Sequence, residues 1–358
     1  MSGPVATAVI VAFNQGRYVE EAVRSVLAQE FPASELEILV VDDGSTDDTE
    51  ARAKGFGDRV RYVRKDNGGE ASALNLGIEI SRGDIIALLE ADDLWHPGKL
   101  GRVARAFDTH PDAAMVYHPY EIWDTRKQER RDDPHFVGLS GRIRDHLADL
   151  LTYDVSGTSV LSFRRSFLER LLPIPPVFRT CVDVYLASLI VLVGPVVALE
   201  EVLATYRKHD DNQSGYDESD AVRRERRWFY VRENVREMQA WVDRSGLDAR
   251  APDVAAYLKR WELWEQICRF CLESPGRRQL FRHLREHQRL YGPVWTRGYR
   301  TFKAAVAVAA LALGYERFES MRARWGGAGF LVGLRKRWLA RYAAASDRAP
   351  RPDRGRLW

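Results

Sequence analysis

The sequence predicts an α/β fold, in which a sheet of mainly parallel strands is flanked by helices and followed by a helical, basic C-terminal region. Three observations predict it. Short apolar runs bounded by turn residues alternate with segments whose apolar residues recur at helical spacing, the pattern of βαβ units. Two of these runs, ILVV and IIALL, end in carboxylates. From Ser274 to Trp358 the chain carries 19 Lys/Arg against 5 Asp/Glu.

Strands are expected where apolar runs are short, and helices where apolar residues repeat every three or four positions. The expected strands are Ala8–Phe13, Ile38–Val41, Arg59–Val63, Asp84–Glu90, Met115–Tyr120, Val155–Phe163 and Val196–Leu203. Helices are expected over residues 18–27, 71–78, 97–107 and 186–193, and in the Trp-rich part after Asp217. The charged stretch from Glu121 to Asp149 is weakly patterned, so we expect it to be a loop that covers the functional site described below.

Size and composition favour a cytosolic protein that is soluble or lies on a surface. The 358 residues suffice for one large domain and a smaller one. Three cysteines are too few for a disulfide framework, and the N-terminus lacks the basic region of a signal peptide. The apolar run from Ala304 to Gly314 is too short to span a bilayer.

The basic C-terminal part suggests an anionic partner. Phe330–Leu339 interleaves apolar and basic residues, as interfacial helices on anionic membrane surfaces do. A basic helix that packs on its own domain is an equal alternative. Nucleic-acid binding is not expected, because no known reading motif accompanies the charge.

The carboxylates after two buried strands are the main candidates for a functional site. Asp42 and Asp43 follow one strand, and Glu90, Asp92 and Asp93 end another. Parallel strands of an open α/β sheet place their carboxyl ends at one ligand crevice. So many acids repel one another unless a cation lies among them, and oxygen ligands favour Mg²⁺ or Mn²⁺. The alternative for the first pair is a solvated turn.

A nucleoside diphosphate is the natural ligand of such a site, because these cations often share substrate phosphates. The chain has neither G-x-G-x-x-G nor G-x-x-x-x-G-K-[ST], so the metal would have to meet the phosphate charge. Cys268, Cys271, His283 and His287 nearly copy a zinc-finger spacing. The helical pattern around both cysteines instead predicts that they pack between helices.

Five segments in order resemble the family 2 glycosyltransferases with a GT-A fold. They are VIVAFNQGRYVEEAVRSVLAQ, VVDDGSTDDT, DNGGEASALNLGI, GDIIALLEADD and YRKHDDNQS, within residues 8–214. The resemblance implies a Rossmann-like nucleotide half with a central mixed sheet, a metal-binding D-x-D-type motif, and inversion at the anomeric carbon. In this chain Glu90 replaces the first Asp of that motif.

The resemblance also implies roles for individual residues. Phe13 would lie against the base, and Asp43 would bind it. Asp92 and Asp93 would serve the ribose, the diphosphate and its cation. The implied nucleotide-sugar ligands are Phe13, Asn14, Asp42, Asp43, Asn67, Asn75, Asp92 and Arg207, and the implied metal ligands are Glu90, Asp92, Asp93 and His209. The segment Tyr206–His209 would form a loop over the diphosphate, where Arg207 or Lys208 offsets leaving-group charge; a solvated histidine is the alternative for His209.

Inverting transfer needs a base that takes the proton of the acceptor hydroxyl. By resemblance that base is Asp183, near the start of a helix, although Val182 replaces the usual Glu. A helix-capping acid is the alternative, and Asp154 is a weaker candidate base. Gly157, Thr158 and Ser159 resemble the stretch that lines the acceptor pocket, with an ordinary turn as the alternative.

We therefore expect a catalytic domain over residues 1–215, with a nucleotide half to about 120 and an acceptor half beyond it. A helical region over 216–345 and a disordered tail over 346–358 follow. The expected function is inverting transfer of a sugar, with UDP as the expected nucleotide, to a glycan or lipid-linked acceptor in cell-surface polysaccharide synthesis. The expected location is the cytoplasm, at the inner face of the plasma membrane if peripheral. The alternatives are a non-catalytic glycan- or membrane-binding protein, favoured by Glu90 and Val182, and a nucleotidyltransferase, which would need a phosphate loop that Asn14–Arg17 does not resemble.

Overall fold

The computed structural model describes residues 5–317 except 134–135, 137, 147–150, 152, 154, 156, 211, 213–220, 274, 295–296 and 316. The chain divides into two compact units, Met1–Leu258 and Lys259–Trp358, which are described separately. Asp154 and Phe330–Leu339 therefore lie outside the described residues. The domain division near residue 215 remains a prediction.

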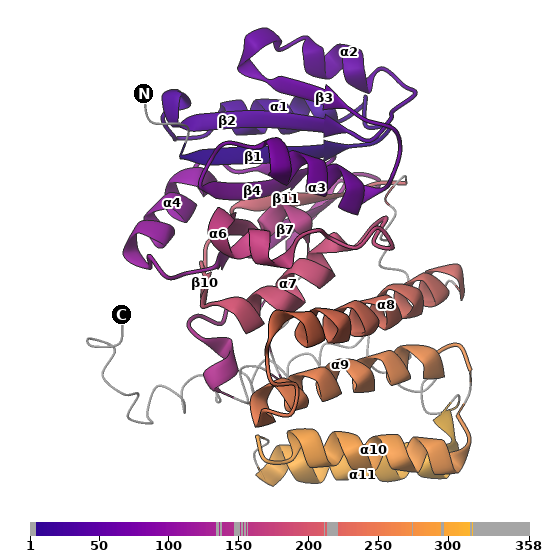
Figure 1. The fold of residues 1–358 in the computed structure, drawn as a ribbon. Coiled ribbons are helices and arrows are strands. Elements are labelled where there is room, and N and C mark those ends of the chain that lie inside the picture. Colours follow the sequence, from indigo (N-terminus) through magenta and orange to yellow (C-terminus); the bar gives the residue numbers. More distant parts are fainter. Residues whose placement is uncertain are drawn as a thin grey trace. The chain divides into compact units, whose positions relative to one another are not determined.

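A seven-stranded mixed sheet forms the centre of the first unit (Figure 1), in the order β10-β6-β9-β4-β1-β2-β3. Its strands are β1 (Ala6–Ala12), β2 (Leu36–Asp42), β3 (Arg61–Arg64), β4 (Ile85–Glu90), β6 (Met115–Tyr117), β9 (Ser162–Arg164) and β10 (Val196–Ala198). β9 runs antiparallel between β4 and β6, and the other pairs are parallel.

The strand β1 is the middle of the parallel part, and its neighbours are β2 and β4. The register pairs Ala12 with Asp42 and Val11 with Glu90, so both acidic strand ends reach the same edge of the sheet. The convergence expected from the sequence is therefore present.

A second sheet, in the order β5-β11-β7-β8, lies in the same unit. Its strands are β5 (Leu94–Trp95), β7 (Tyr120–Asp124), β8 (Glu129–Asp132) and β11 (Ala204–Lys208). The expected loop over 121–149 is wrong in its first part, because β7 and β8 pair as a hairpin. The loop expected at 206–208 is also wrong: these residues pair with β7 inside β11. The expected strand Val155–Phe163 is largely replaced by a 3₁₀ turn at Thr158–Val160 before β9.

The helices of the first unit are α1 (Val19–Leu27), α2 (Thr49–Lys54), α3 (Glu70–Ile80), α4 (Lys99–Thr109), α6 (Arg165–Leu168), α7 (Val182–Val193) and α8 (Ala221–Ser245). Most of them lie near the predicted positions, whereas the short helices α2 and α6 were not expected. Helix α3 packs tightly on β1 and β2: a Cβ on Gly77 would lie 2.7 Å from Cγ1 of Val9 and 3.1 Å from Cγ2 of Val41. Its N-terminal end is thereby fixed near the acidic strand ends.

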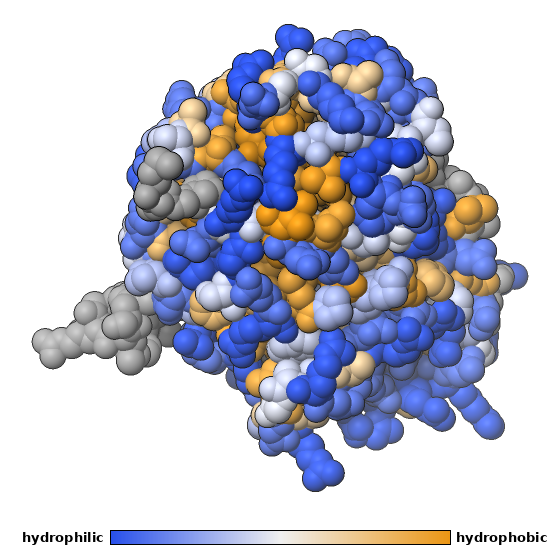
Figure 2. All heavy atoms as spheres, turned by 45° about the horizontal axis from the view of Figure 1, so that its top comes forward, coloured by the Kyte–Doolittle hydropathy of each residue, from blue (hydrophilic) through white to orange (hydrophobic). Residues whose placement is uncertain are grey.

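The surface of this unit is mixed. Figure 2, in which the top of Figure 1 comes forward, shows hydrophobic residues grouped in the middle of one face with hydrophilic residues around them. Apolar atoms make up much of any folded surface, so this grouping alone indicates no partner.

The second unit is helical as expected. It contains the later part of α9 (Pro252–Phe270), α10 (Arg277–Tyr291) and α11 (Arg297–Leu313). Its core includes Phe270, Leu280, Ala310 and Tyr315. No helix among the described residues is long and apolar enough to cross a membrane.

The cysteine and histidine residues of this unit do not form a zinc site. Cys271 Sγ lies 3.3 Å from the hydroxyl of Tyr315, and His283 Nδ1 lies 3.0 Å from Gln266 Oε1. Within the described part of the chain, the one group of His, Cys, Asp or Glu side chains close enough to hold a metal is Glu90, Asp92 and Asp93.

Candidate active site

The buried carboxylates at the end of β2 hold the neighbouring loops in place. Asp42 accepts hydrogen bonds from the backbone N–H of Ser45 (2.8 Å) and from the hydroxyl of Tyr62 (2.5 Å). Asp43 is 2% exposed, and both of its oxygens accept hydrogen bonds from the Lys65–Gly69 loop. These contacts order the loop before α3; binding of the base by Asp43 remains a prediction.

Gly69 allows that loop to close. Its φ is +87°, its N–H donates to Asp43 at 2.7 Å, and a Cβ there would lie 2.7 Å from the Cα of Arg179. A side chain at this position would meet both a strained backbone and a steric clash. Asn67 of the same loop donates its amide to Asp43 and accepts from the guanidinium of Arg179.

Phe13 and Asn14 lie at the end of β1. The Phe13 ring is 38% exposed, which leaves it free to contact a ligand. Asn14 has a positive φ of 53° and accepts a hydrogen bond from the N–H of Thr46, while its own N–H donates to Ser45 Oγ. Asn75 lies on α3, where its amide group makes two hydrogen bonds to the backbone of Ile174; a donor-binding role for it remains a prediction.

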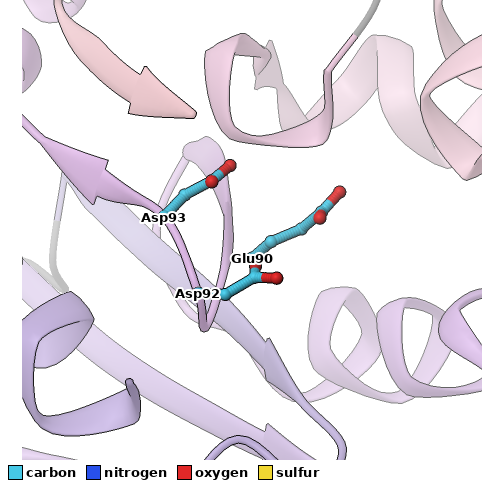
Figure 3. Close-up of side chains that lie close together, drawn as sticks. All are labelled: Glu90, Asp92 and Asp93. Carbon is cyan, nitrogen blue, oxygen red and sulfur yellow. The ribbon is translucent and has the colours of Figure 1, made fainter. Parts of the chain in front are cut away.

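Glu90, Asp92 and Asp93 form a compact cluster at the end of β4. One oxygen of each lies within 4.8 Å of the others, and Figure 3 shows all three side chains leaving the same turn. Asp93 accepts hydrogen bonds from Ser159 Oγ (2.6 Å) and from the N–H of Arg207 (2.9 Å). The cluster is thus tied to β11, the strand that the sequence did not reveal.

Two residues that follow β11 contact the side chain of Asp92. His209 Nε2 lies 3.0 Å from Asp92 Oδ2, and Asn212 Nδ2 lies 3.3 Å from the same oxygen. His209 is 6% exposed, and its ring lies at a tilt against that of Tyr18, with the ring centroids 4.5 Å apart. It is therefore packed beside the acids and not solvated; whether it binds a metal remains a prediction.

Burial and neighbouring negative charge raise the pKa of Glu90 and of Asp93. Burial, reinforced by Asp92, raises the pKa of Asp93 to about 8. Burial also raises the pKa of Glu90 well above its usual value, with Glu70 and the two aspartates adding to the effect. A divalent cation would relieve this repulsion, and carboxylate oxygens are the ligands that Mg²⁺ and Mn²⁺ prefer. The donor set therefore fits such an ion.

Asp183 is the second residue of α7. Its Oδ2 accepts a hydrogen bond of 2.6 Å from the N–H of Gly157, so a distant segment fixes its position. The preceding Cys181 has a left-handed backbone with φ 62°, an uncommon conformation for a non-glycine residue that is often found at functional sites. Burial raises the pKa of the Cys181 thiol, so this cysteine is not an activated nucleophile.

Glu70 is a functional candidate that the sequence did not single out. Its carboxylate accepts hydrogen bonds from Thr158 Oγ1 (3.0 Å) and from the N–H of Val182 (3.4 Å). Burial, together with the charge of Asp183, raises the pKa of Glu70 to about 7. An acid from α3 therefore lies beside Val182, where the family usually has a Glu. The sequence feature that could have indicated Glu70 is its place at the start of a helix, directly after Gly68 and Gly69.

Each residue of the segment Gly157–Ser159 donates a hydrogen bond to a different acid of the site. Gly157 donates to Asp183, Thr158 to Glu70, and Ser159 to Asp93. Thr158 and Ser159 are almost fully buried, and their hydroxyls are used by these bonds. The acceptor role expected for this segment remains a prediction.

Arg207 is 3% exposed on β11. Its guanidinium donates to Glu21 at 2.6 Å and lies over the rings of Tyr18 and Trp123. The side chain is thus packed between aromatic residues near the cluster, and contact with a leaving group remains a prediction.

Comparison with known proteins agrees with this geometry. Residues 7–172 match the model of Glycosyl transferase family 2. An uncharacterised glycosyltransferase of Nostoc sp. is 33% identical over 218 residues, which are 57% of this chain and 65% of that protein. The chain spans less than two thirds of the length of this relative.

Two solved structures show the same fold. S. aureus TarS 1-349 in complex with UDP has a TM-score of 0.58 and 15% identity, covering 89% of this chain and 91% of that one. The mannosyltransferase PcManGT from Pyrobaculum calidifontis, in complex with GDP-Man and Mn²⁺, has a TM-score of 0.55 and 18% identity, covering 96% and 86%.

The fold is therefore of the GT-A type, as predicted. Over residues 7–172 the chain is similar to Glycosyl transferase family 2.

The raised pKa of Glu70 predicts a pH-dependent stability effect. Between pH 4.5 and about 7 the folded protein binds more protons at Glu70 than the unfolded chain does, so this group makes folding less favourable as pH rises through that window. Relative to the native protein, Glu70→Gln should therefore gain free energy of unfolding from pH 5 to pH 8, measured by denaturant titration in EDTA. Glu79→Gln, at an exposed position of the same helix, is the control; parallel pH profiles of Glu70→Gln and native protein would contradict the assignment.

Proposed function

We propose that the protein transfers a sugar from a nucleoside-diphosphate sugar to an acceptor hydroxyl with inversion at the anomeric carbon. The observation that carries the proposal is the acidic cluster of Glu90, Asp92 and Asp93 at the end of β4, with Asp92 beside His209, in a family 2 domain. UDP is the proposed nucleotide.

The cluster would hold a Mn²⁺ or Mg²⁺ ion. Glu90, Asp92, Asp93 and His209 are the proposed ligands. When bound, such an ion supplies positive charge that stabilises the departing diphosphate. Glu90 is one methylene longer than the Asp usual in the family. Burial and the neighbouring acids already disfavour its charge, which supports a cation as its partner.

Asp183 is the proposed base. It takes the proton of the acceptor hydroxyl while that oxygen forms a bond to the anomeric carbon, and the bond from that carbon to the diphosphate breaks. The nucleoside diphosphate leaves with the electron pair. The hydrogen bond from Gly157 and the neighbouring Glu70 would position Asp183 for this step.

The remaining binding roles follow the family pattern. Phe13, Asn14, Asp42, Asp43, Asn67, Asn75 and Arg207 are the proposed donor ligands, with Gly157–Ser159 on the acceptor side. The exposed ring of Phe13 is the feature that best supports a base-binding position. A glycan or lipid-linked acceptor, a role in cell-surface polysaccharide synthesis and a cytoplasmic location, peripheral at the inner face of the plasma membrane, complete the proposal.

Calorimetry with UDP tests the donor site. We expect binding to the full chain that is about tenfold or more tighter with Mn²⁺ than in EDTA, because the ion joins the cluster to the diphosphate. Asp92→Asn should lose this difference, whereas Asp108→Asn, at an exposed position of α4, should keep it. Absence of UDP binding by the native chain would favour the non-catalytic alternative.

The base assignment is tested separately by Asp183→Asn. This nearly isosteric change keeps an acceptor for the N–H of Gly157 but removes the basic oxygen, so transfer should fall about 10²–10⁴-fold while affinity for UDP is unchanged. The readout is transfer or donor hydrolysis with the nucleotide sugar that a donor screen selects. Full activity of Asp183→Asn would show that another residue is the base.

A further inference from the structure

Helix α10 carries a continuous basic face. Its fifteen residues include five arginines and a single acid, Glu286. All five arginines are exposed, and positions 278, 282, 285 and 289 recur at the spacing of one helix face. Over 11 residues this face extends for about 16 Å. Its residues are Arg277, Arg278, Arg282, Arg285 and Arg289.

These arginines are not used to stabilise the second unit through ion pairs. Glu286, the one acid of the helix, lies 2.9 Å from Lys259 Nζ. Among the described residues, no carboxylate forms an ion pair with any of the five arginines. The positive charge on this face is therefore available to an external partner.

Apolar side chains lie among the charges. The five arginines line an open hollow of about 600 Å³ together with Glu286, Phe281 and Leu311. Phe281 is 54% exposed. On α11, Val308 is 66% exposed and precedes Leu311 by three residues, so the two side chains share one side of that helix.

Phe281 and Val308 are exposed although the second unit has a core of its own. Leu280 and Ala310, from the same two helices, are 2% and 3% exposed and pack with Phe270 and Tyr315. Helices α10 and α11 thus each bury one face in the unit and present another, basic on α10 and aliphatic on α11, to solvent.

We propose that this α10–α11 surface, consisting of the five arginines with Phe281, Val308 and Leu311, binds an anionic phospholipid membrane. The guanidinium groups contact headgroup phosphates, and the apolar side chains enter the boundary between headgroups and acyl chains. Basic residues combined with exposed Phe and aliphatic side chains are the pattern of interfacial helices.

Two other anionic partners fit the surface less well. A nucleic acid would match the arginines, and its bases would stack on Phe281, but it has no acyl layer to cover an aliphatic residue as exposed as Val308. A free phosphate would need converging donors at one point, whereas these arginines are spread along three turns. A lipid surface satisfies both the extended charge and the apolar contacts.

Membrane binding by the α10–α11 surface deepens the peripheral location proposed above and does not depend on the transfer reaction. It would bring the chain to a lipid-linked acceptor. Vesicle binding can be measured without donor or acceptor, so failure of one proposal is distinguishable from failure of the other.

The test is flotation of the full chain with vesicles of phosphatidylcholine alone or with 30% phosphatidylglycerol. We expect binding to the anionic vesicles at low salt, weakened by high salt. The triple variant R278E/R282E/R285E should bind about 100-fold more weakly, since each arginine near an anionic surface contributes about fivefold. Phe281→Ser should also reduce binding, at unchanged charge.

The matched control is R59E/R105E/R250E, which changes net charge equally at exposed positions of the first unit. It should keep most of the binding. Equal losses in both triple variants, equal binding to neutral vesicles, or no binding by the native chain would overturn the proposal. So would tighter binding of an oligonucleotide than of vesicles, or full competition by inorganic phosphate at millimolar concentration.

Discussion

Electrostatic repulsion among carboxylates is the constraint on which the rest of the site depends. The parallel pairing of β1 with β2 and β4 brings Asp42, Asp43 and Glu90 to one edge of the sheet, and the turn after β4 adds Asp92 and Asp93. Glu70 and Asp183 come from the starts of two helices. Such a group stays together only because hydrogen bonds hold it, and its raised pKa values show the cost. A cation is the simplest means of lowering that cost.

The hydrogen-bonding pattern separates two kinds of acid. Asp42 and Asp43 accept bonds from their own loops and act first as structural supports. Asp92 lies beside His209, and Asp183 accepts a hydrogen bond from the backbone N–H of Gly157. Acids such as Asp92 and Asp183 suit a site whose charge changes during a reaction. Acids such as Asp42 and Asp43 suit a site that must keep its shape.

Local patterns predicted much of the fold and part of the site. The spacing of apolar residues located β1, β2 and β4, which are apolar runs buried in the sheet, and helices α1, α3 and α4, which bury one face. The strand-end acids followed directly. The hairpin of β7 and β8 was missed because the residues of β8 are charged and exposed. β11 was missed because Tyr206–Lys208 pairs with β7, more than 80 residues earlier.

Glu70 illustrates why the remainder of the site was hidden. It meets Thr158 and Val182, which lie 88 and 112 residues further along the chain, and no periodicity links positions so far apart. Its proximity to Asp183 depends on the backbone hydrogen bonds that join the start of α3 to Phe178 and Arg179, just before α7, and on the left-handed Cys181. Long-range placement of this kind is set by tertiary packing, not by local sequence.

The central claim is that these acids gather around one cation. Anomalous X-ray scattering from crystals grown with Mn²⁺ and UDP tests it most directly. The account predicts one manganese peak bonded to carboxylate oxygens of the Glu90, Asp92 and Asp93 cluster and to UDP. A peak bound elsewhere, or UDP seated in the site with no manganese beside these side chains, would contradict it.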